Sequence, residues 1–414
     1  MSSRQYLVIF VLNSRQIMED LFIFQNNLLS QISMDWKRYL FAELKSEEKL
    51  LGIKGIRGVG KTTLLLQYLK SSSLALNQKL YVTADHPYFY QNSLFSFASE
   101  FYSHGGQLLL IDEVHKYPNW SRELKLIYDG FPNLKVIFTS SSALDLYRGE
   151  SDLSRRLITQ NLQGLSFREY LNLTQSLELQ KFSLKELISN HLQISTSLLE
   201  KFEAITSFRK YVNYGYFPIV STNSPEGVYT RVFQIINAVL ESDLAFAKEY
   251  SPSNIIKIKK LLGVISVSVP FEPNISKIAE KLGLGRTTVY SFLAHLHEAK
   301  LIRMINKPNH GINYLQKPDK IYFENTNFAF ALQTQPNIGT IRETFFASQL
   351  INGGHRLELS AKGDFLIDDT WTVEIGGKSK DGNQIKGVEN SFLALDEIEI
   401  GFGKRIPLWL FGFL

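Results

Sequence analysis

A glycine-rich segment that ends in a lysine and a hydroxyl stands between an apolar run and a helix-like stretch. Residues 55–62 read G-I-R-G-V-G-K-T, after an apolar run over 50–56 and before a stretch with helical spacing. Glycines let the backbone turn tightly and bring its N–H groups against phosphate oxygens, and the positive end of the next helix points at the same place. Lys61 would place a full charge between the β- and γ-phosphates of ATP, and the Thr62 hydroxyl is a Mg²⁺ ligand in such loops. The predicted nucleotide-binding residues are Gly55, Ile56, Arg57, Gly58, Val59, Gly60, Lys61, Thr62 and Thr63.

Two carboxylates follow a second apolar run. Residues 108–111 are all Leu or Ile, and Asp112 and Glu113 come directly after them. An acid at the end of a strand next to the loop would hold Mg²⁺ through its water shell, which is the role we expect for Asp112. Glu113 would then polarise the attacking water.

Hydroxyl side chains follow a third apolar run, over residues 135–138. The sequence continues T-S-S-S from Thr139, at the point where the γ-phosphate would lie. One of Thr139 and Ser140 would orient the water that attacks the phosphate. The alternative is ordinary turn and helix-cap chemistry, for which Ser and Thr are common.

An arginine pair precedes the last apolar run, over residues 157–162. Arg155 or Arg156 would stabilise the charge of the transition state, either within the chain or from a neighbouring protomer of a homo-oligomer. The alternative is a solvated surface pair.

The apolar runs over 50–56, 79–83, 108–111, 135–138 and 157–162 are continuous rather than alternating. Strands that are buried on both faces have this pattern, so the sequence predicts a parallel sheet with helices on both faces. The fold class expected for this part is an α/β P-loop NTPase fold.

At this point the sequence resembles a known family. Residues 111–120, 138–142, 149–156 and 165–171 together resemble prokaryotic AAA-type ATPases that carry a C-terminal DUF4143 domain and are related to archaeal and STAND-like P-loop ATPases. The resemblance covers roughly residues 35–414. It implies an ATPase core, a winged-helix segment and a C-terminal domain similar to restriction-endonuclease-like folds. Members often have Gly at the position of Ser140.

A helix-turn-helix pattern lies further along the chain. Residues 275–284 and 285–296 read as two helices around a glycine-containing turn, and 301–305 and 312–315 would form a wing. The second helix would face the major groove of DNA, although such a module also serves as a compact link between domains. The predicted DNA-contacting residues are Arg286, Thr287, Thr288 and Tyr290.

Carboxylates recur near the C-terminus. Asp364 and Glu374 would lie side by side on paired strands, share a divalent ion and use Lys378 to neutralise charge at a scissile phosphate, with Glu343 as a further acid. This is similar to PD-(D/E)xK nucleases, but Gly376 occupies the position of the expected lysine. The alternative is a structural remnant without activity.

The amino-acid composition excludes several classes of function. The chain of 414 residues has no cysteine, which excludes disulfide scaffolds, thiolate nucleophiles and Cys-based metal sites, and a reducing cytoplasmic location is the simplest expectation. No apolar run approaches the roughly 20 residues that cross a bilayer, so no membrane contact is expected. The net charge of +5 permits a polyanionic partner without requiring one. Met18 or Met34 is an alternative start.

Five segments are therefore expected. They are an N-terminal helical segment (1–48), the P-loop AAA-type ATPase core (49–170), a helical lid or linker (171–260), a winged helix-turn-helix (261–325) and the C-terminal DUF4143-like domain (326–414). In the last, a helix is predicted over 340–351 and strands over 356–359, 364–367, 371–375, 397–400 and 408–411. The predicted function is Mg-dependent ATP binding and hydrolysis, coupled to rearrangement of the C-terminal domains. The alternatives are a nucleotide-switched DNA-binding regulator and a metal-dependent nuclease of a mobile-element or defence system.

Overall fold

The computed structural model describes residues 3–140, 153, 155–267, 273–308, 318–333 and 335–414. The chain divides into two compact units, Met1–Leu162 and Gln163–Leu414. None of the helices in these described ranges is both long and apolar enough to span a bilayer.

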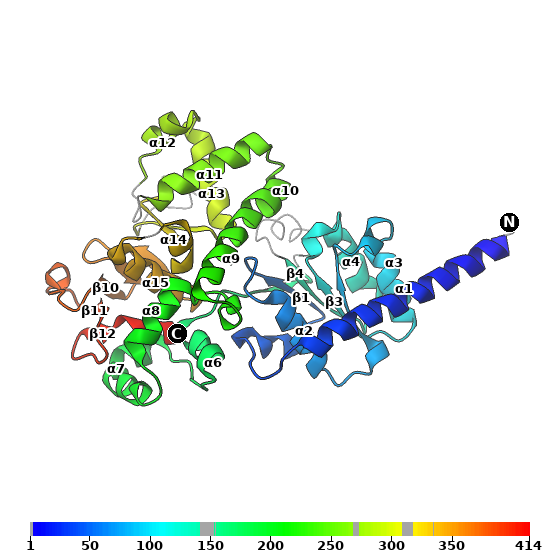
Figure 1. Ribbon diagram of the computed structural model, residues 1–414, viewed down its shortest axis with the longest axis horizontal. Helices are drawn as coiled ribbons and strands as arrows, with labels where there is room; N and C mark the ends of the chain where they lie inside the picture. Colours follow the sequence, from blue (N-terminus) through cyan, green and yellow to red (C-terminus); the bar gives the residue numbers. More distant parts are fainter. Residues whose placement is uncertain (1–2, 141–152, 154, 268–272, 309–317, 334) are drawn as a thin grey trace. The chain divides into compact units, whose positions relative to one another are not determined.

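A five-stranded parallel sheet forms the centre of the first unit (Figure 1). Its strand order is β2-β3-β4-β1-β5, and all neighbouring strands run parallel. All five strands expected from the apolar runs are present near their predicted positions, because strands buried on both faces need continuous apolar residues. The strands are β1 (Leu50–Lys54), β2 (Lys79–Thr83), β3 (Leu108–Asp112), β4 (Lys135–Ser140) and β5 (Ile158–Asn161).

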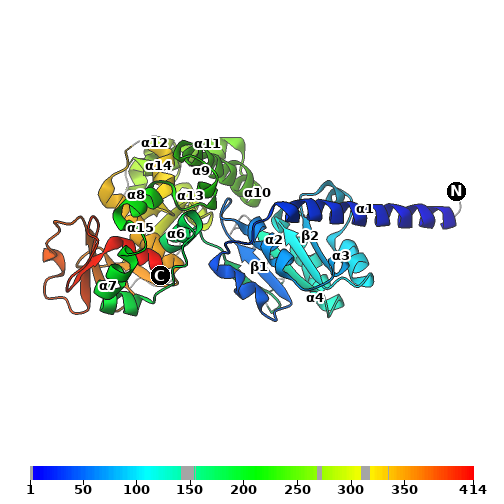
Figure 2. The same cartoon turned by 60° about the horizontal axis from the view of Figure 1, so that its bottom comes forward.

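Three helices connect these strands and cover the sheet (Figure 2). They are α2 (Lys61–Ser71), α3 (Leu94–Ser103) and α4 (Trp120–Gly130). Helix α3 begins where the Ser93 hydroxyl accepts a hydrogen bond from the Ser96 backbone N–H. The apolar faces of α3 and α4 pack with alternate residues of β2, β3 and β4 in one core cluster. The other face of these strands is in contact with α2.

The N-terminal helix α1 (Ser3–Gln31) contacts β2 and α2. The Gln25 side chain of this helix accepts a hydrogen bond from the Tyr81 backbone N–H. Since β2 is an edge strand, this bond gives a partner to an N–H group that has no neighbouring strand. The prediction of helix up to residue 48 was wrong in part. Beyond α1, only short 3-10 turns at Tyr39–Phe41 and Glu43–Lys45 precede β1.

The second unit begins as a helical region, as expected. The 3-10 turn Pro218–Ser221 separates two of its helices. The helices are α6 (Phe167–Gln175), α7 (Leu184–Leu199), α8 (Ala204–Tyr214), α9 (Pro225–Ala238), α10 (Ala245–Lys248) and α11 (Pro252–Ser266), with a π-helical turn at Val239–Leu244.

Two short helices and a two-stranded ribbon follow. Helices α12 (Ile275–Leu282) and α13 (Arg286–Glu298) lie at the two positions expected from the helix-turn-helix pattern, and Gly283 between them has a φ of 61°. Strand β6 (Ile302–Ile305) lies where the first part of the wing was predicted. It pairs antiparallel with β7 (Lys320–Phe323), a strand that the sequence did not predict. The predicted strand over 312–315 lies outside the described residues.

The chain ends in a second five-stranded sheet of order β12-β11-β10-β9-β8, preceded by α14 (Thr326–Leu332) and α15 (Ile338–Asn352). Two predictions were wrong here. Residues 397–400 form no strand, since Glu397 has a φ of 63°, and residues 408–411 belong to the 3-10 helix Leu408–Phe413. The strands are β8 (Leu357–Leu359), β9 (Phe365–Ile367), β10 (Trp371–Gly376), β11 (Ser391–Leu395) and β12 (Arg405–Pro407).

Candidate functional site

The glycine-rich loop connects β1 to α2 at the carboxyl end of the first sheet. Gly58 and Gly60 have φ values of 81° and 94°, which side chains with a Cβ rarely adopt. A Cβ added at Gly55 would lie 2.4 Å from the carbonyl oxygen of Leu162. Three glycines of the predicted motif are therefore required by the backbone itself.

Lys61, the first residue of α2, is folded back onto this loop. Its Nζ donates to the backbone oxygens of Gly55 at 2.7 Å and Ile56 at 3.2 Å, and the residue is only 5% exposed. The Arg38 guanidinium, also buried, donates to the Val59 carbonyl at 2.6 Å. The loop thus keeps its shape and holds an ammonium at the N-terminal end of a helix, an arrangement suited to phosphate.

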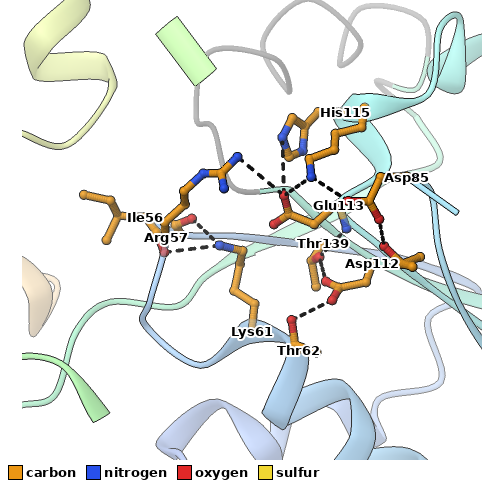
Figure 3. A network of polar contacts seen from close by, with 12 residues as sticks. Ile56, Arg57, Lys61, Thr62, Asp85, Asp112, Glu113, His115 and Thr139 are labelled. Atoms are coloured by element: carbon orange, nitrogen blue, oxygen red, sulfur yellow. Dashed lines mark hydrogen bonds and ion pairs between the residues drawn. The ribbon is translucent and has the colours of Figure 1, made fainter. Parts of the chain in front are cut away.

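Asp112 lies across from the loop, at the end of β3, and accepts three hydroxyl hydrogen bonds. Its Oδ2 accepts from Thr62 at 2.6 Å and its Oδ1 accepts from Thr139 (Figure 3). Its Oδ2 also accepts from Tyr81 at 2.9 Å. The carboxylate is 3% exposed, so its orientation is set by these three donors. The predicted neighbourhood of Thr62 and Asp112 is present in the structure.

Glu113 follows in a left-handed backbone conformation, with a φ of 53°. Its Oε2 is buried and accepts no hydrogen bond, although the Lys116 Nζ and the His115 Nε2 lie 3.7 Å away and the Arg57 guanidinium 4.0 Å away (Figure 3). Burial raises the pKa of Glu113, and the Lys61 ammonium opposes that rise. An unsatisfied carboxylate oxygen in this position is suited to accept a proton from water.

His115 and Lys116 were not singled out from the sequence. Burial, together with the charges of Lys61 and Arg57, lowers the pKa of His115 to about 3, so the imidazole is neutral near pH 7. Lys116 also forms an ion pair with Asp85 at 2.6 Å, which keeps its ammonium beside the Glu113 carboxylate. Both His115 and Lys116 lie in the segment 111–120 that carries the family resemblance, but Asp85 comes from the segment after a different strand, so the spacing did not predict their contact.

The residues at this site fit a magnesium ion by the chemistry of their donors. A hydroxyl and a carboxylate oxygen, those of Thr62 and Asp112, are hard ligands, and they lie 2.6 Å apart. Within the described ranges no group of three His, Cys, Asp or Glu side chains is arranged to hold a metal alone. Phosphate oxygens and water would therefore complete the coordination shell.

Thr139 and Ser140, the two candidates for orienting the attacking water, are both fully buried at the end of β4. The Thr139 hydroxyl accepts from the Glu113 backbone N–H at 3.0 Å and donates to Asp112. Thr139 therefore connects the two carboxylate residues. The hydroxyls that follow, from residue 141 on, lie outside the described residues.

Arg156, the second residue of the arginine pair, forms a structural ion pair. Arg156 makes a two-point ion pair with Asp129, with Nε donating at 2.8 Å and NH2 at 3.1 Å. Asp129 is near the C-terminal end of α4, and Lys49, just before β1, donates to the carbonyl of the preceding Tyr128. This contact therefore lies at the amino end of the strands, opposite the end that carries the glycine-rich loop. Arg155 is exposed. The structure does not bring Arg156 to the loop of its own chain, and a role in a neighbouring protomer stays a prediction.

The C-terminal acids are brought together in the second unit. Asp364 Oδ2 accepts from the Ile375 backbone N–H at 2.6 Å, next to Glu374, and Glu343 accepts from Tyr322 at 2.6 Å. Burial raises the pKa of both Glu343 and Asp364. The Asp364 charge raises the pKa of Glu343 further, and the Glu374 charge raises that of Asp364. Glu374 is 1% exposed.

The lysine beside Glu374 is a correction to the sequence-based prediction. Lys380, not Lys378, places its Nζ 2.9 Å from Glu374 Oε1. The chain turns after Gly376, where a Cβ would lie 2.7 Å from the Lys380 side chain. The backbone oxygen of Lys378 instead accepts from Arg405.

The residues predicted to contact DNA lie at the start of α13. Arg286 and Thr287 are exposed, and Thr288 and Tyr290 are half-buried. Lys277 and Lys281 on α12 are exposed as well, so cationic side chains stand on both helices.

Two family models match this chain. Residues 47–171 match an AAA domain, and residues 205–337 match a domain of unknown function, DUF8612. The first match confirms the ATPase part of the family resemblance. The second covers most of the expected helical linker, the winged helix-turn-helix and only the first residues of the expected DUF4143-like domain, which stays a prediction.

Similar proteins were found in archaea and bacteria. An uncharacterised protein of Methanocaldococcus jannaschii is 25% identical over 322 residues, which cover 72% of this chain and 67% of that protein. Among solved structures, a Walker-type ATPase of Pyrococcus abyssi aligns with a TM-score of 0.40 at 13% identity, covering 69% of this chain and 91% of that one. AMPPCP-bound DnaA from Aquifex aeolicus aligns with a TM-score of 0.28 at 16% identity, covering 63% and 85%.

Proposed function

We propose that this chain, whose residues 47–171 form an AAA-type P-loop ATPase domain, binds Mg-ATP at the glycine-rich loop and hydrolyses it. The observation that carries the proposal is the convergence of Lys61, Thr62 and Asp112 at one end of the sheet, with the buried Glu113 carboxylate beside them. These groups supply the charge, the metal ligands and the base that phosphoryl transfer to water requires.

Each residue has a separate task in this reaction. Lys61 exchanges the backbone oxygens of Gly55 and Ile56 for phosphate oxygens, which offer it a full negative charge. Glu113 Oε2 accepts a hydrogen bond and then a proton from the attacking water. Bound Mg²⁺ supplies charge neutralisation at the phosphate oxygens.

A lysine substitution tests the proposal. Lys61→Ala removes the ammonium from the loop, and ATP binding measured by calorimetry should be lost, because the main charge on the phosphates is missing. Lys70→Ala is the matched control, since Lys70 is exposed near the other end of the same helix. Equal ATP binding by Lys61→Ala and the parent chain would refute the site assignment.

A contact inside the first unit supports coupling of hydrolysis to the rest of the chain. Leu162 is the last residue of this unit, and its N–H donates to the Lys54 carbonyl at 2.7 Å while its own carbonyl lies against Gly55. A movement of the loop around phosphate therefore acts directly on the segment that leads into the second unit. We expect ATP to change hydrogen exchange within residues 163–414 in the parent chain and not in Lys61→Ala.

DNA binding is a second candidate, supported by the exposed cations of α12 and α13. Lys277, Lys281 and Arg286 are exposed and would contact phosphates, as would the exposed Thr287. Fluorescence anisotropy with a duplex should show affinity that falls steeply with salt and is weaker in Arg286→Ala. Arg209→Ala, at an exposed arginine of α8, serves as the control. Affinity that is indifferent to salt and to Arg286 would exclude this function.

Metal-dependent nuclease activity is supported by one observation, the buried Glu374 carboxylate beside Asp364 and Lys380. Plasmid incubated with Mg²⁺ or Mn²⁺ should be cleaved by the parent chain and left intact by Glu374→Gln. Glu389→Gln, at an exposed acid between β10 and β11, should cleave like the parent. Absence of cleavage, or cleavage by Glu374→Gln, would eliminate the nuclease.

A further inference from the structure

We propose that Tyr81 is a positioning residue of the ATPase site, and that its hydroxyl sets the metal affinity by fixing the Asp112 carboxylate. Tyr81 lies on β2, outside the loop and outside the acid pair, and no motif of the sequence contains it. This inference rests on the proposed function, because it concerns the metal that would accompany ATP.

The position of Tyr81 follows from the register of the sheet. Tyr81 is the partner of Leu110 in the parallel pairing of β2 with β3, while Thr83 is the partner of Asp112. Side chains two residues apart in a strand share a face, so the Tyr81 ring extends along the strands toward Asp112. Its hydroxyl donates to Asp112 Oδ2 at 2.9 Å, and only 3% of the residue is exposed.

The backbone of Tyr81 is held as well. The Gln25 side chain of α1 accepts from its N–H at 2.7 Å, although β2 is an edge strand of the sheet. The backbone N–H of Tyr81 is therefore bound to α1, and its hydroxyl is bound to the Asp112 carboxylate.

The Asp112 carboxylate has two kinds of partner. The Thr62 hydroxyl on Oδ2 belongs to the loop and would itself be a metal ligand, so this bond would be given up when a metal is held. The bonds from Tyr81 and Thr139 come from neighbouring strands and remain. Tyr81 is then the donor that keeps Oδ2 directed toward the metal-bound water, as partners of ligand groups do in metal sites generally.

Tyr81→Phe tests this role because it removes one oxygen and keeps the ring. Two affinities are measured in the full chain: that of Mn²⁺ in the presence of a non-hydrolysable ATP analogue, by electron paramagnetic resonance, and that of the analogue in EDTA, by calorimetry. We expect the Mn²⁺ affinity to fall by roughly tenfold or more and the metal-free nucleotide affinity to stay the same. If Tyr81 contributed only to packing, Tyr81→Phe would not lower the Mn²⁺ affinity while keeping the metal-free nucleotide affinity.

Tyr117→Phe is the matched control. The Tyr117 hydroxyl also donates to a carboxylate, Glu123 Oε1 at 2.9 Å, in the same unit. It should leave both affinities unchanged. Tyr81→Leu, a second variant without the hydroxyl, should reproduce the metal defect, and circular dichroism reports whether each variant folds.

The outcomes separate the two proposals. If the parent chain binds the analogue and Tyr81→Phe has the same Mn²⁺ affinity as the parent, this inference is overturned. The proposed ATP site is then unaffected. A parallel loss of metal-free nucleotide binding in Tyr81→Phe would also overturn it, since the effect would then be on the whole site. A parent chain that binds no ATP analogue would overturn both.

Discussion

At the scale of single residues, the environment of the Glu113 carboxylate suits its proposed role as proton acceptor. Its Oε2 is buried without a hydrogen bond, and its backbone is held by the Thr139 hydroxyl in a left-handed conformation. A buried acceptor without a partner costs free energy, and such a cost is common at sites where a substrate or water later supplies the missing donor.

We expect Glu113→Gln to separate ATP binding from hydrolysis. An amide cannot take a proton from water, so kcat should fall by about 10²–10⁴, while ATP affinity should be kept because Lys61 and Thr62 are unchanged. Phosphate release and calorimetry measure the two quantities. Glu48→Gln, at an exposed acid ahead of β1, is the control and should hydrolyse ATP normally. If Glu113→Gln hydrolyses ATP at the parent rate, a residue other than Glu113 takes the proton from water.

A second residue-scale prediction concerns Thr139, whose hydroxyl both accepts from Glu113 and donates to Asp112. Because both of these bonds are used, we expect its hydroxyl to act by aligning the two acids. Thr139→Ser keeps the hydroxyl and should keep most of the activity, whereas Thr139→Val should lower kcat by roughly tenfold or more, as a lost bond to a charged group implies. Similar rates for the two variants would show that this hydroxyl has no part in the alignment.

The loop and the acid pair at the end of a neighbouring strand could be predicted from sequence, because each is a continuous segment with its own chemistry, whereas single residues that the fold brings to a site could not. The loop from Gly55 to Thr62 was predicted because its chemistry and its spacing lie together. Tyr81 was missed because a tyrosine in an apolar strand has no distinguishing neighbours. Lys378 was predicted in place of Lys380 because residue spacing does not reveal how the chain turns after Gly376.

At the scale of elements, a buried ion pair joins β6 and the end of β7 to α15. Arg303 NH2 donates to Glu324 Oε1 at 2.5 Å and to Asn352 Oδ1 at 2.6 Å, and the two charged side chains are 4% and 2% exposed. A charge left alone in such a place is strongly destabilising, whereas an apolar pair of similar volume is tolerated.

Arg303→Met should therefore lower the free energy of unfolding by about 3–5 kcal/mol, measured with urea, because Glu324 is left buried without its cation. The double variant Arg303→Met/Glu324→Leu should recover most of this loss. Lys259→Met breaks the more exposed pair with Glu241 and should cost no more than about 1 kcal/mol. An equal loss in the single and double variants would show that packing, not charge, explains the effect.

His297 on α13 gives the same unit a dependence on pH. Burial lowers its pKa to about 4, and its Nδ1–H donates to the Ile302 carbonyl. In the unfolded chain a histidine has a pKa of about 6.5, so between pH 6.5 and 4 only the unfolded state binds this proton. Stability is therefore lost as the pH falls through this window, with a slope of at most about 1.4 kcal/mol per pH unit.

We expect His297→Gln to have a shallower decline of unfolding free energy between pH 6.5 and 4, because the titrating group is gone. Urea titrations at several pH values measure the slope. His104→Gln removes an exposed histidine and should follow the parent chain. Parallel slopes for the parent and His297→Gln would contradict the assignment of this proton.

The strands of the two sheets differ in how far the sequence predicts them. In the first sheet, each continuous apolar run is a strand, because parallel strands are covered on both faces. In the second sheet, the apolar run at the C-terminus is the 3-10 helix Leu408–Phe413, and the strand β11 (Ser391–Leu395) was missed. Short apolar runs do not distinguish a strand from a buried helical turn, so the decision is made by tertiary contacts.

At the scale of the whole molecule, the division after Leu162 has a consequence for function. The loop, the acid pair, Tyr81 and Thr139 all belong to Met1–Leu162. The ATPase core expected over 49–170 agrees with the AAA-domain match over 47–171, while the compact unit ends a few residues earlier. What ends the unit is the pairing of β5 with β1, which is a long-range contact.

Since every group assigned to nucleotide binding lies in the first unit, we expect residues 1–162 alone to bind ATP with an affinity close to that of the full chain. Calorimetry measures the binding, and circular dichroism verifies that the fragment is folded. The fragment with Lys61→Ala is the control and should not bind, because the loop lacks its charge. A folded fragment that fails to bind ATP would show that residues beyond Leu162 complete the site, and the contact between the Leu162 carbonyl and Gly55 would then be the place to look for their effect.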